Sequence, residues 1–120
     1  MKFLVVEDTS YVGEALCEML RVLSEKMQLG GAIIDWARTI PEAEAFFGQK
    51  QYDLVLSDFD LKHPEKNGLE LAKIARERGW ARKIIIMSGL VKNLVACEEA
   101  GFQILPKPST VQQLMQAIRN

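Results

Sequence analysis

The sequence predicts an α/β domain built on one doubly wound, five-stranded parallel sheet. Short apolar, β-branched runs alternate five times with longer segments whose apolar residues recur at helical spacing. Each such unit is about twenty residues long, enough for a helix to cross between parallel strands. The strand runs are almost continuously apolar, which is typical of strands covered on both faces. We therefore expect a (βα)5 arrangement with right-handed crossovers, forming a single domain over residues 1–120.

The first unit is a strand over Phe3–Val6 followed by an amphipathic helix. Polar residues from Glu7 to Ser10 supply helix-capping side chains between the two. The helix is indicated by an apolar stripe at Val12, Ala15, Leu16, Met19, Leu20 and Leu23.

The second unit starts after Gly30-Gly31 with a strand over Ala32–Trp36. The segment Thr39–Glu42 has the form of a capping box with a proline in the first turn. Thr39 would accept a bond from the helix backbone and Glu42 would return one. The helix that follows ends near Gly48.

The third strand lies in the run from Tyr52 to Asp60, which is mostly apolar and ends in the carboxylates Asp58 and Asp60. A carboxylate at the carboxyl end of a buried strand can stay solvated while the residues before it are packed. After a loop over Leu61–Lys66, the segment Asn67–Glu70 caps a third helix. That helix carries Leu69, Leu71, Ala72, Ile74 and Ala75 and is closed by Gly79.

The last two units complete the alternation. A strand over Lys83–Ser88 precedes a short helix from Val91 to Ala100, which Gly101 stops. A fifth strand over Phe102–Leu105 leads into a rigid turn over Pro106–Pro108. The segment Ser109–Gln112 then caps a final helix with an apolar stripe at Val111, Leu114, Met115 and Ile118.

The carboxyl ends of the strands in such a sheet form one rim, where ligands bind. The residues at these ends are acidic, apart from one hydroxyl and one ammonium group: Glu7, Asp8, Asp35, Asp58, Asp60, Ser88 and Lys107. Two carboxylates about 5 Å apart repel by roughly 3 kcal/mol at an effective dielectric constant of about 20. Mg²⁺, which prefers hard oxygen ligands, would neutralise them.

This set of residues suits phosphoryl chemistry. Asp58 could attack a phosphoryl group and form an aspartyl phosphate. Lys107 would neutralise the developing charge, and Ser88 would bond an equatorial oxygen. Taken singly, each residue has a structural explanation, such as helix capping by Glu7-Asp8, so the argument rests on their joint placement. We expect Asp35 to be structural.

Composition narrows the function further. The formal net charge is −1 with acids and bases interspersed, so no basic face for nucleic acid or an anionic membrane is expected. No apolar run approaches the roughly 20 residues of a membrane span, and we expect a cytoplasmic protein. Cys17 and Cys97 lack metal or redox spacing and are expected to be small buried residues. His63 has no second ligand nearby and is expected to be solvated.

The chain resembles a response-regulator receiver domain, the phosphoaspartate module of two-component signalling, over its whole length. The resemblance rests on the acidic pair, the third strand's end, the opening of the third helix, the switch hydroxyl and the lysine–proline pair: Glu7-Asp8, Asp58, Asn67-Gly68, Ser88-Gly89 and Lys107-Pro108. The resemblance, rather than the spacing, implies the strand order 2-1-3-4-5 of flavodoxin-like and CheY-like domains.

The resemblance also implies a phosphorelay. A sensor histidine kinase or histidine phosphotransfer protein would phosphorylate Asp58, with Mg²⁺ as cofactor. Asp8 and Asp58 would bind the metal directly, Glu7 through water and Asp60 through its backbone carbonyl. Ser88 would move to the phosphoryl group, Lys107 would pair with it, and the Lys107-Pro108 bond would be cis.

The output implied by the resemblance is altered binding of a downstream effector. It would use the surface of the fourth helix, fifth strand and fifth helix. The chain would be no enzyme beyond its own phosphotransfer and autodephosphorylation. We expect part of the apolar set Leu90, Val91, Leu94 and Val95 to form this surface, and at least half of it to pack in the core.

Several positions depart from the family pattern. Ile104 stands where the family usually has the aromatic residue that follows the switch hydroxyl. The loop Leu61–Lys66 is longer than the common pattern, and the fourth helix is shorter. Asp60 and Leu90 occupy positions that resemble tuning sites for phosphate lifetime.

Two other functions stay open on the sequence. A pseudo-receiver would keep the fold and signal without phosphate, which Ile104 and the altered loop permit. A phosphatase of the haloacid-dehalogenase type would use Asp58 as nucleophile and Asp60 as acid, because Asp58-Phe59-Asp60 is similar to that family's Asp-x-Asp pair. Those enzymes place the pair on the first strand, whereas two strands precede Asp58 here.

Overall fold

The computed structural model describes residues 1–120 and contains one five-stranded sheet, in the order β2-β1-β3-β4-β5. The strands are β1 (Lys2–Val6), β2 (Ile33–Ala37), β3 (Tyr52–Asp58), β4 (Ala81–Ser88) and β5 (Gln103–Pro106). The helices are α1 (Ser10–Lys26), α2 (Ile40–Phe47), α3 (Gly68–Glu77), α4 (Val91–Glu99) and α5 (Val111–Arg119). All strand pairs are parallel. The expected (βα)5 fold and strand order are confirmed.

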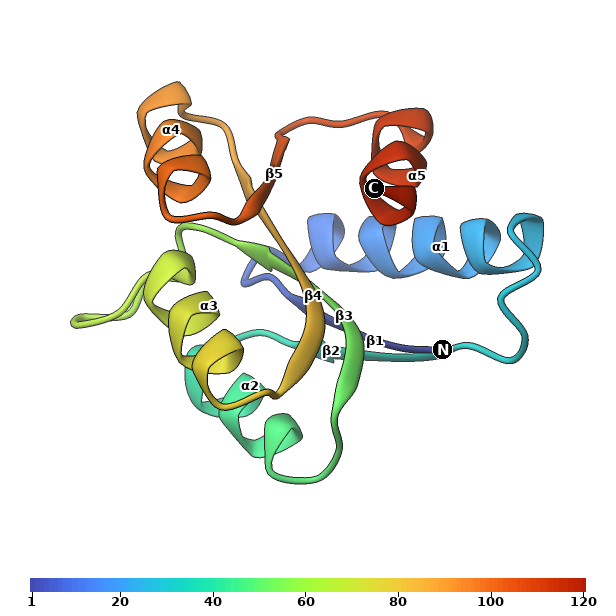
Figure 1. Cartoon of the computed structure of the whole chain (residues 1–120), viewed down its shortest axis with the longest axis horizontal. Coiled ribbons are helices and arrows are strands. Elements are labelled where there is room, and N and C mark those ends of the chain that lie inside the picture. The colour runs from blue at the N-terminus through green and yellow to red at the C-terminus, as the bar shows by residue number, and fades with distance from the viewer.

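The sheet is covered on both faces, with α1 and α5 on one side and α2, α3 and α4 on the other (Figure 1). Alternate strand residues face opposite sides and form two separate cores. Phe3, Val5 and Leu56 belong to the core under α1 and α5, whereas Leu4 and Val55 belong to the core under the other three helices. Burial on both faces explains why the strand sequences are almost continuously apolar.

Strand boundaries differ slightly from those expected. β2 continues to Ala37, so Asp35 lies within the strand and not at its end. β4 already begins at Ala81, because this residue pairs with Tyr52 at the start of β3. β5 runs to Pro106, which pairs in register with Ser88.

Three helices begin at side-chain caps. The Asn67 Oδ1 accepts from the Glu70 amide at 2.9 Å, as expected for α3. At α2, Thr39 accepts from the Glu42 amide at 3.2 Å, but the Glu42 carboxylate bonds the Arg38 amide and the Thr39 hydroxyl, so the expected box is incomplete.

The complete capping box is at α5, where Thr110 and Gln113 exchange bonds. It lies one residue later than the segment Ser109–Gln112 suggested. The first residues of α1 behave differently, because Thr9 makes no side-chain cap bond. None of the helices has the length and apolar character needed to cross a membrane.

Candidate functional site

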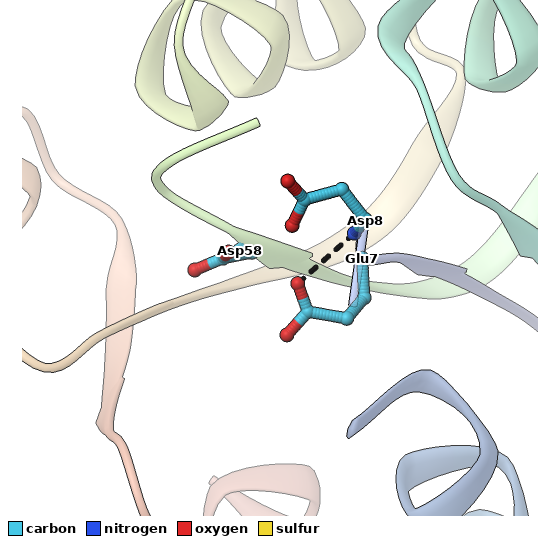
Figure 2. Close-up of side chains that lie close together, drawn as sticks. All are labelled: Glu7, Asp8 and Asp58. Carbon is cyan, nitrogen blue, oxygen red and sulfur yellow. Dashed lines mark hydrogen bonds between the residues drawn. The ribbon is translucent and has the colours of Figure 1, made fainter. Parts of the chain in front are cut away.

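The carboxyl ends of β1 and β3 bring three carboxylates together. Glu7 and Asp8 directly follow β1, Asp58 is the last residue of β3, and Val6 pairs with Ser57 in the register of these two strands. One ligand oxygen from each of the three carboxylates lies within 4.8 Å of the other two. Figure 2 shows Glu7 and Asp8 leaving the chain on opposite sides, with the Glu7 carboxylate accepting a bond from the Asp8 amide at 3.0 Å.

These carboxylates are more buried than the sequence suggested. Glu7 is 0% exposed and Asp58 is 7% exposed, so the picture of a solvated Asp58 is wrong. The start of α3 covers the end of β3, where the Gly68 amide donates to the Phe59 carbonyl at 2.6 Å. A Cβ at Gly68 would lie 2.1 Å from the Asp58 carbonyl oxygen, so only glycine permits this approach.

Lys107 provides the positive charge facing this cluster. Its Nζ lies 2.7 Å from Glu7 Oε1 and 3.4 Å from Asp58 Oδ1. Its amide donates to the Ser88 carbonyl at 3.0 Å, and the Lys107-Pro108 bond is cis, as the resemblance implied. Burial favours the neutral amine, but the bond to Glu7 and the charges of Asp58 and Glu7 outweigh it and raise the pKa of Lys107.

Lys107 does not fully offset the effects that raise the pKa of Asp58. Burial, followed by the charge of Glu7, raises the pKa of Asp58 from 3.8 to about 7, against the opposing effect of Lys107. If all three carboxylates of the cluster were ionised, Lys107 alone would not neutralise them. One carboxylate oxygen, Asp8 Oδ2, is buried and has no hydrogen-bond partner. A hard divalent cation fits this oxygen-only donor set.

Ser88, the last residue of β4, lines one side of a cleft that Asp8, Asp58 and Lys107 also line. It is 5% exposed, and its Oγ accepts bonds from the Leu90 amide at 3.1 Å and from Asn93 Nδ2 at 3.2 Å. Asn93 lies in the first turn of α4 and was not identified from the sequence. Its side-chain type and spacing there do not differ from those of an ordinary solvated residue.

The fold and this geometry agree with the family comparison. A family model described as the response regulator receiver domain matches residues 3–119. The chain belongs to this family. The swarming motility regulation protein RssB of Serratia marcescens is 30% identical over 122 residues, an alignment that covers 99% of this chain and 52% of the relative. The transcriptional regulatory protein PmrA of Pectobacterium parmentieri is also 30% identical over 122 residues, covering 99% of this chain and 51% of the relative. This receiver domain thus spans about half the length of these curated relatives.

Solved receiver domains show the same fold. One from Clostridium thermocellum has a TM-score of 0.80 at 24% identity, covering 99% of this chain and 91% of that one. The non-phosphorylated receiver domain of HemR from Leptospira biflexa has a TM-score of 0.75 at 27% identity, covering 99% and 94%.

The loop after β3 contributes a residue that sequence reasoning missed. Lys62 Nζ lies 3.6 Å from Asp8 Oδ2, although the Lys62 side chain is 79% exposed. Asp60 is exposed, and its carboxylate accepts from the Lys62 amide at 3.4 Å instead of joining the three-carboxylate cluster. His63 is half-buried and its Nδ1 accepts from two loop amides, so the expectation of a solvated ring is wrong.

Trp36 is the third residue that sequence reasoning missed. Its Nε1 donates to the Glu7 carbonyl at 2.9 Å and so holds the backbone that carries the acidic pair. A Cβ at Gly13 would lie 2.2 Å from the Trp36 ring, so this glycine makes room for the indole beside α1. The contact links two distant segments and leaves no signature in local sequence.

Two further expectations are settled away from the cleft. Asp35 accepts from the Tyr52 hydroxyl at 2.6 Å and from Lys50 at 3.0 Å, which confirms a structural role with partners that the sequence did not reveal. Cys97 is buried, as expected, but Cys17 is only half-buried, so the expectation of a buried residue is wrong there. Burial raises the pKa of both thiols.

Apolar residues at the start of α4 are more exposed than expected. Leu90, Val91 and Val95 are 56%, 74% and 47% exposed, and Leu94 is half-buried. The expectation that at least half of this set packs in the core is wrong. The reason is that α4 places a single buried residue, Cys97, against the sheet.

Proposed function

We propose that this receiver domain, spanning residues 1–120, accepts a phosphoryl group on Asp58 from a phosphohistidine of a sensor kinase or phosphotransfer protein. The observation that carries the proposal is the position of Asp58 at the end of β3. Its carboxylate lies within 4.8 Å of ligand oxygens of Glu7 and Asp8 and 3.4 Å from Lys107 Nζ. A carboxylate nucleophile beside paired acids and a lysine matches the requirements of phosphoryl transfer.

In the proposed step, an Asp58 carboxylate oxygen forms a bond to phosphorus while the bond from phosphorus to the donor imidazole nitrogen breaks. The electron pair of that bond leaves with the imidazole. Lys107 places a positive charge beside the transferred group, and the Ser88 hydroxyl, once turned toward it, donates to an equatorial oxygen. The burial of Asp58 favours this chemistry because electrostatic interactions strengthen where water is excluded.

We further propose that the cation is Mg²⁺. Asp8 and Asp58 would bind it directly, Glu7 through water and Asp60 through its backbone carbonyl. Asp8 Oδ2, which has no hydrogen-bond partner, and the gathering of three carboxylates support this assignment. When bound, the metal would neutralise charge on the phosphoryl oxygens and on the carboxylates.

The proposed output is a change in the surface formed by α4, β5 and α5. The exposed side chains of Leu90, Val91, Val95 and Val111 provide apolar area for an effector protein or domain. We propose a cytoplasmic switch that catalyses only its own phosphorylation and dephosphorylation. Neither nucleic acid nor a membrane is expected to bind this chain directly, given its net charge of −1.

The two alternatives are less well supported. A phosphatase that uses Asp60 as a general acid needs that carboxylate beside Asp58, yet Asp60 is exposed and bonded to the Lys62 amide. A pseudo-receiver would not need the polar side chains that gather at one rim, which are Glu7, Asp8, Asp58, Ser88 and Lys107. The family match favours the phosphoacceptor over both.

Labelling with acetyl phosphate and Mg²⁺, followed by intact mass measurement, tests the assignment. The wild-type domain is expected to gain one hydroxylamine-sensitive phosphoryl group, and Asp58→Asn is expected to gain none. Asp60→Asn is the matched control, since it removes the neighbouring carboxylate and should still be labelled. Continued labelling of Asp58→Asn, or continuous turnover of a phosphomonoester by the wild type, would contradict the proposal.

A further inference from the structure

The hydrogen bonds of the Ser88 hydroxyl point to a route by which this site reaches α4. In this chain the position expected to follow the hydroxyl is Ile104, a half-buried residue of β5 that packs in the core and has no polar side-chain atom. Ile104 therefore cannot exchange a hydrogen bond with Ser88. The only side chain bonded to the Ser88 Oγ is that of Asn93, at 3.2 Å.

The second bond to the Ser88 Oγ is local. The Leu90 amide donates to it at 3.1 Å, from two residues along the chain. Such a turn orders the backbone next to the serine and does not reach into the helix. Asn93 is different because it lies inside α4, with its own amide bonded to the Leu90 carbonyl at 3.1 Å. The Asn93 side chain thus connects the hydroxyl to the first turn of the helix.

α4 is an element that a single hydrogen bond can influence. It contacts β4 and β5 at the edge of the sheet (Figure 1), and Cys97 is its only buried residue. By comparison, α3 has five buried residues, so it is held by far more apolar packing. The position of a helix with so little buried surface depends strongly on the remaining contacts at its first turn.

We propose that Asn93 is the positioning residue that couples the Ser88 hydroxyl to α4, in the role that the residue at position 104 cannot fill. This inference rests on the proposed phosphorylation of Asp58. When the Ser88 hydroxyl turns to donate to the phosphoryl group, its oxygen moves relative to β4 and the Asn93 amide follows it. The first turn of α4 shifts in consequence, and with it the exposed apolar side chains of Val91 and Val95.

Amide NMR spectra with and without beryllofluoride and Mg²⁺ test this coupling. In the wild type we expect shifts at two places: the site (Asp58, Ser88, Lys107) and α4 (Val91, Leu94, Val95). In Asn93→Ala the site shifts should persist while the α4 shifts shrink severalfold. Lys92→Ala is the matched control, because Lys92 is an exposed neighbour with no ion pair or hydrogen bond of its side chain, and it should keep both sets of shifts.

A double-mutant cycle guards against a purely structural explanation. In the resting state, Asn93→Ala should speed amide exchange in α4 severalfold. The same substitution should add nothing once Ser88→Ala has removed the shared bond. Undiminished α4 shifts in Asn93→Ala, additive effects in the cycle, or wild-type shifts confined to the site would each overturn the coupling alone. Absence of any site shift in the wild type would overturn the proposed function together with it.

Discussion

The two sides of the cleft are built very differently. On the strand side, Glu7, Asp8 and Asp58 end two central strands, and Glu7 and Asp58 are 0% and 7% exposed. On the helix side, Ser88 bonds to α4, a helix with one buried residue. The first arrangement holds its carboxylates in buried positions, whereas the second rests on little buried surface, which is typical of elements that open easily. The proposed switch needs both features: a fixed site that accepts the phosphoryl group and a helix that can move in response.

The largest effect should come from disturbing the strand side at Gly68. In Gly68→Ala the new Cβ would lie 2.1 Å from the Asp58 carbonyl oxygen and 2.8 Å from the Phe59 Cα. Both are backbone atoms, so relief requires α3 to move off the end of β3. We expect a loss of about 3 kcal/mol of unfolding free energy or more, measured by urea denaturation.

Gly31→Ala is the control for this substitution, because nothing lies within 4 Å of a Cβ at that position. Its unfolding free energy should stay within about 1 kcal/mol of the wild-type value. If Gly68→Ala were as well tolerated as Gly31→Ala, the strand side would be softer than we infer.

The next largest effect concerns the charge of Asp58 in the metal-free protein. Burial and the charge of Glu7 raise its pKa from 3.8 to about 7 in the folded state. Between these values the folded chain binds a proton that the unfolded chain has lost, so the contribution of Asp58 to stability is lost as pH rises through this window. Asp58→Asn, which cannot ionise, should therefore be more stable than the wild type by roughly 2 to 4 kcal/mol at about pH 8.

Urea unfolding with a chelator present at several pH values measures this difference. The gap between Asp58→Asn and the wild type should narrow steadily as pH falls toward the ordinary pKa of an aspartate. A wild type that equals or exceeds the variant in stability above pH 7 would show that Lys107 compensates the cluster fully.

A smaller effect should come from a substitution in α4, and it should be confined to that helix. Cys97→Ala removes the sulfur of the only buried residue of α4, with an expected cost of about 1 kcal/mol. Since α4 is lightly packed, we expect faster hydrogen exchange in its amides and little change in those of β1 and β3. Cys17→Ala in α1 should leave α4 exchange unchanged. Equal acceleration in α4 and the central strands would mean that the two sides unfold together.

Site residues were easiest to predict from the sequence where the sheet topology brings distant positions of the chain close together. Asp58, Ser88 and Lys107 lie at the ends of three strands, and neighbouring parallel strands bring their carboxyl ends to the same rim. Glu7 and Asp8 were found in the same way. The family resemblance supplied the strand order, which spacing alone does not determine.

Features that depend on packing between distant segments were not readable. The close packing of α3 on the end of β3 follows from the approach of Gly68, and the exposure of Val91 follows from how little of α4 contacts the sheet. Asn93 and Lys62 are polar residues of ordinary type, and nothing in the sequence distinguishes them from solvated neighbours. Their roles depend on rotamers and distances that only the folded chain defines.

The smallest predicted effect concerns the ion pair between Lys62, in the loop after β3, and Asp8. Lys62 Nζ is 3.6 Å from Asp8 Oδ2, and its side chain is 79% exposed, so the pair contributes less than about 1 kcal/mol. The Mg²⁺ ion proposed to bind Asp8 would compete with this ammonium group for the carboxylate. Lys62→Gln should therefore bind Mg²⁺ about two- to fivefold more tightly by calorimetry, since each 1.4 kcal/mol is about tenfold in affinity. The gain should shrink at high salt, which screens exposed charges.

Lys92→Gln is the control, because it removes a charge of the same sign that has no ion pair. A gain in Mg²⁺ affinity as large as that of Lys62→Gln would show that overall charge, not the contact with Asp8, sets the affinity.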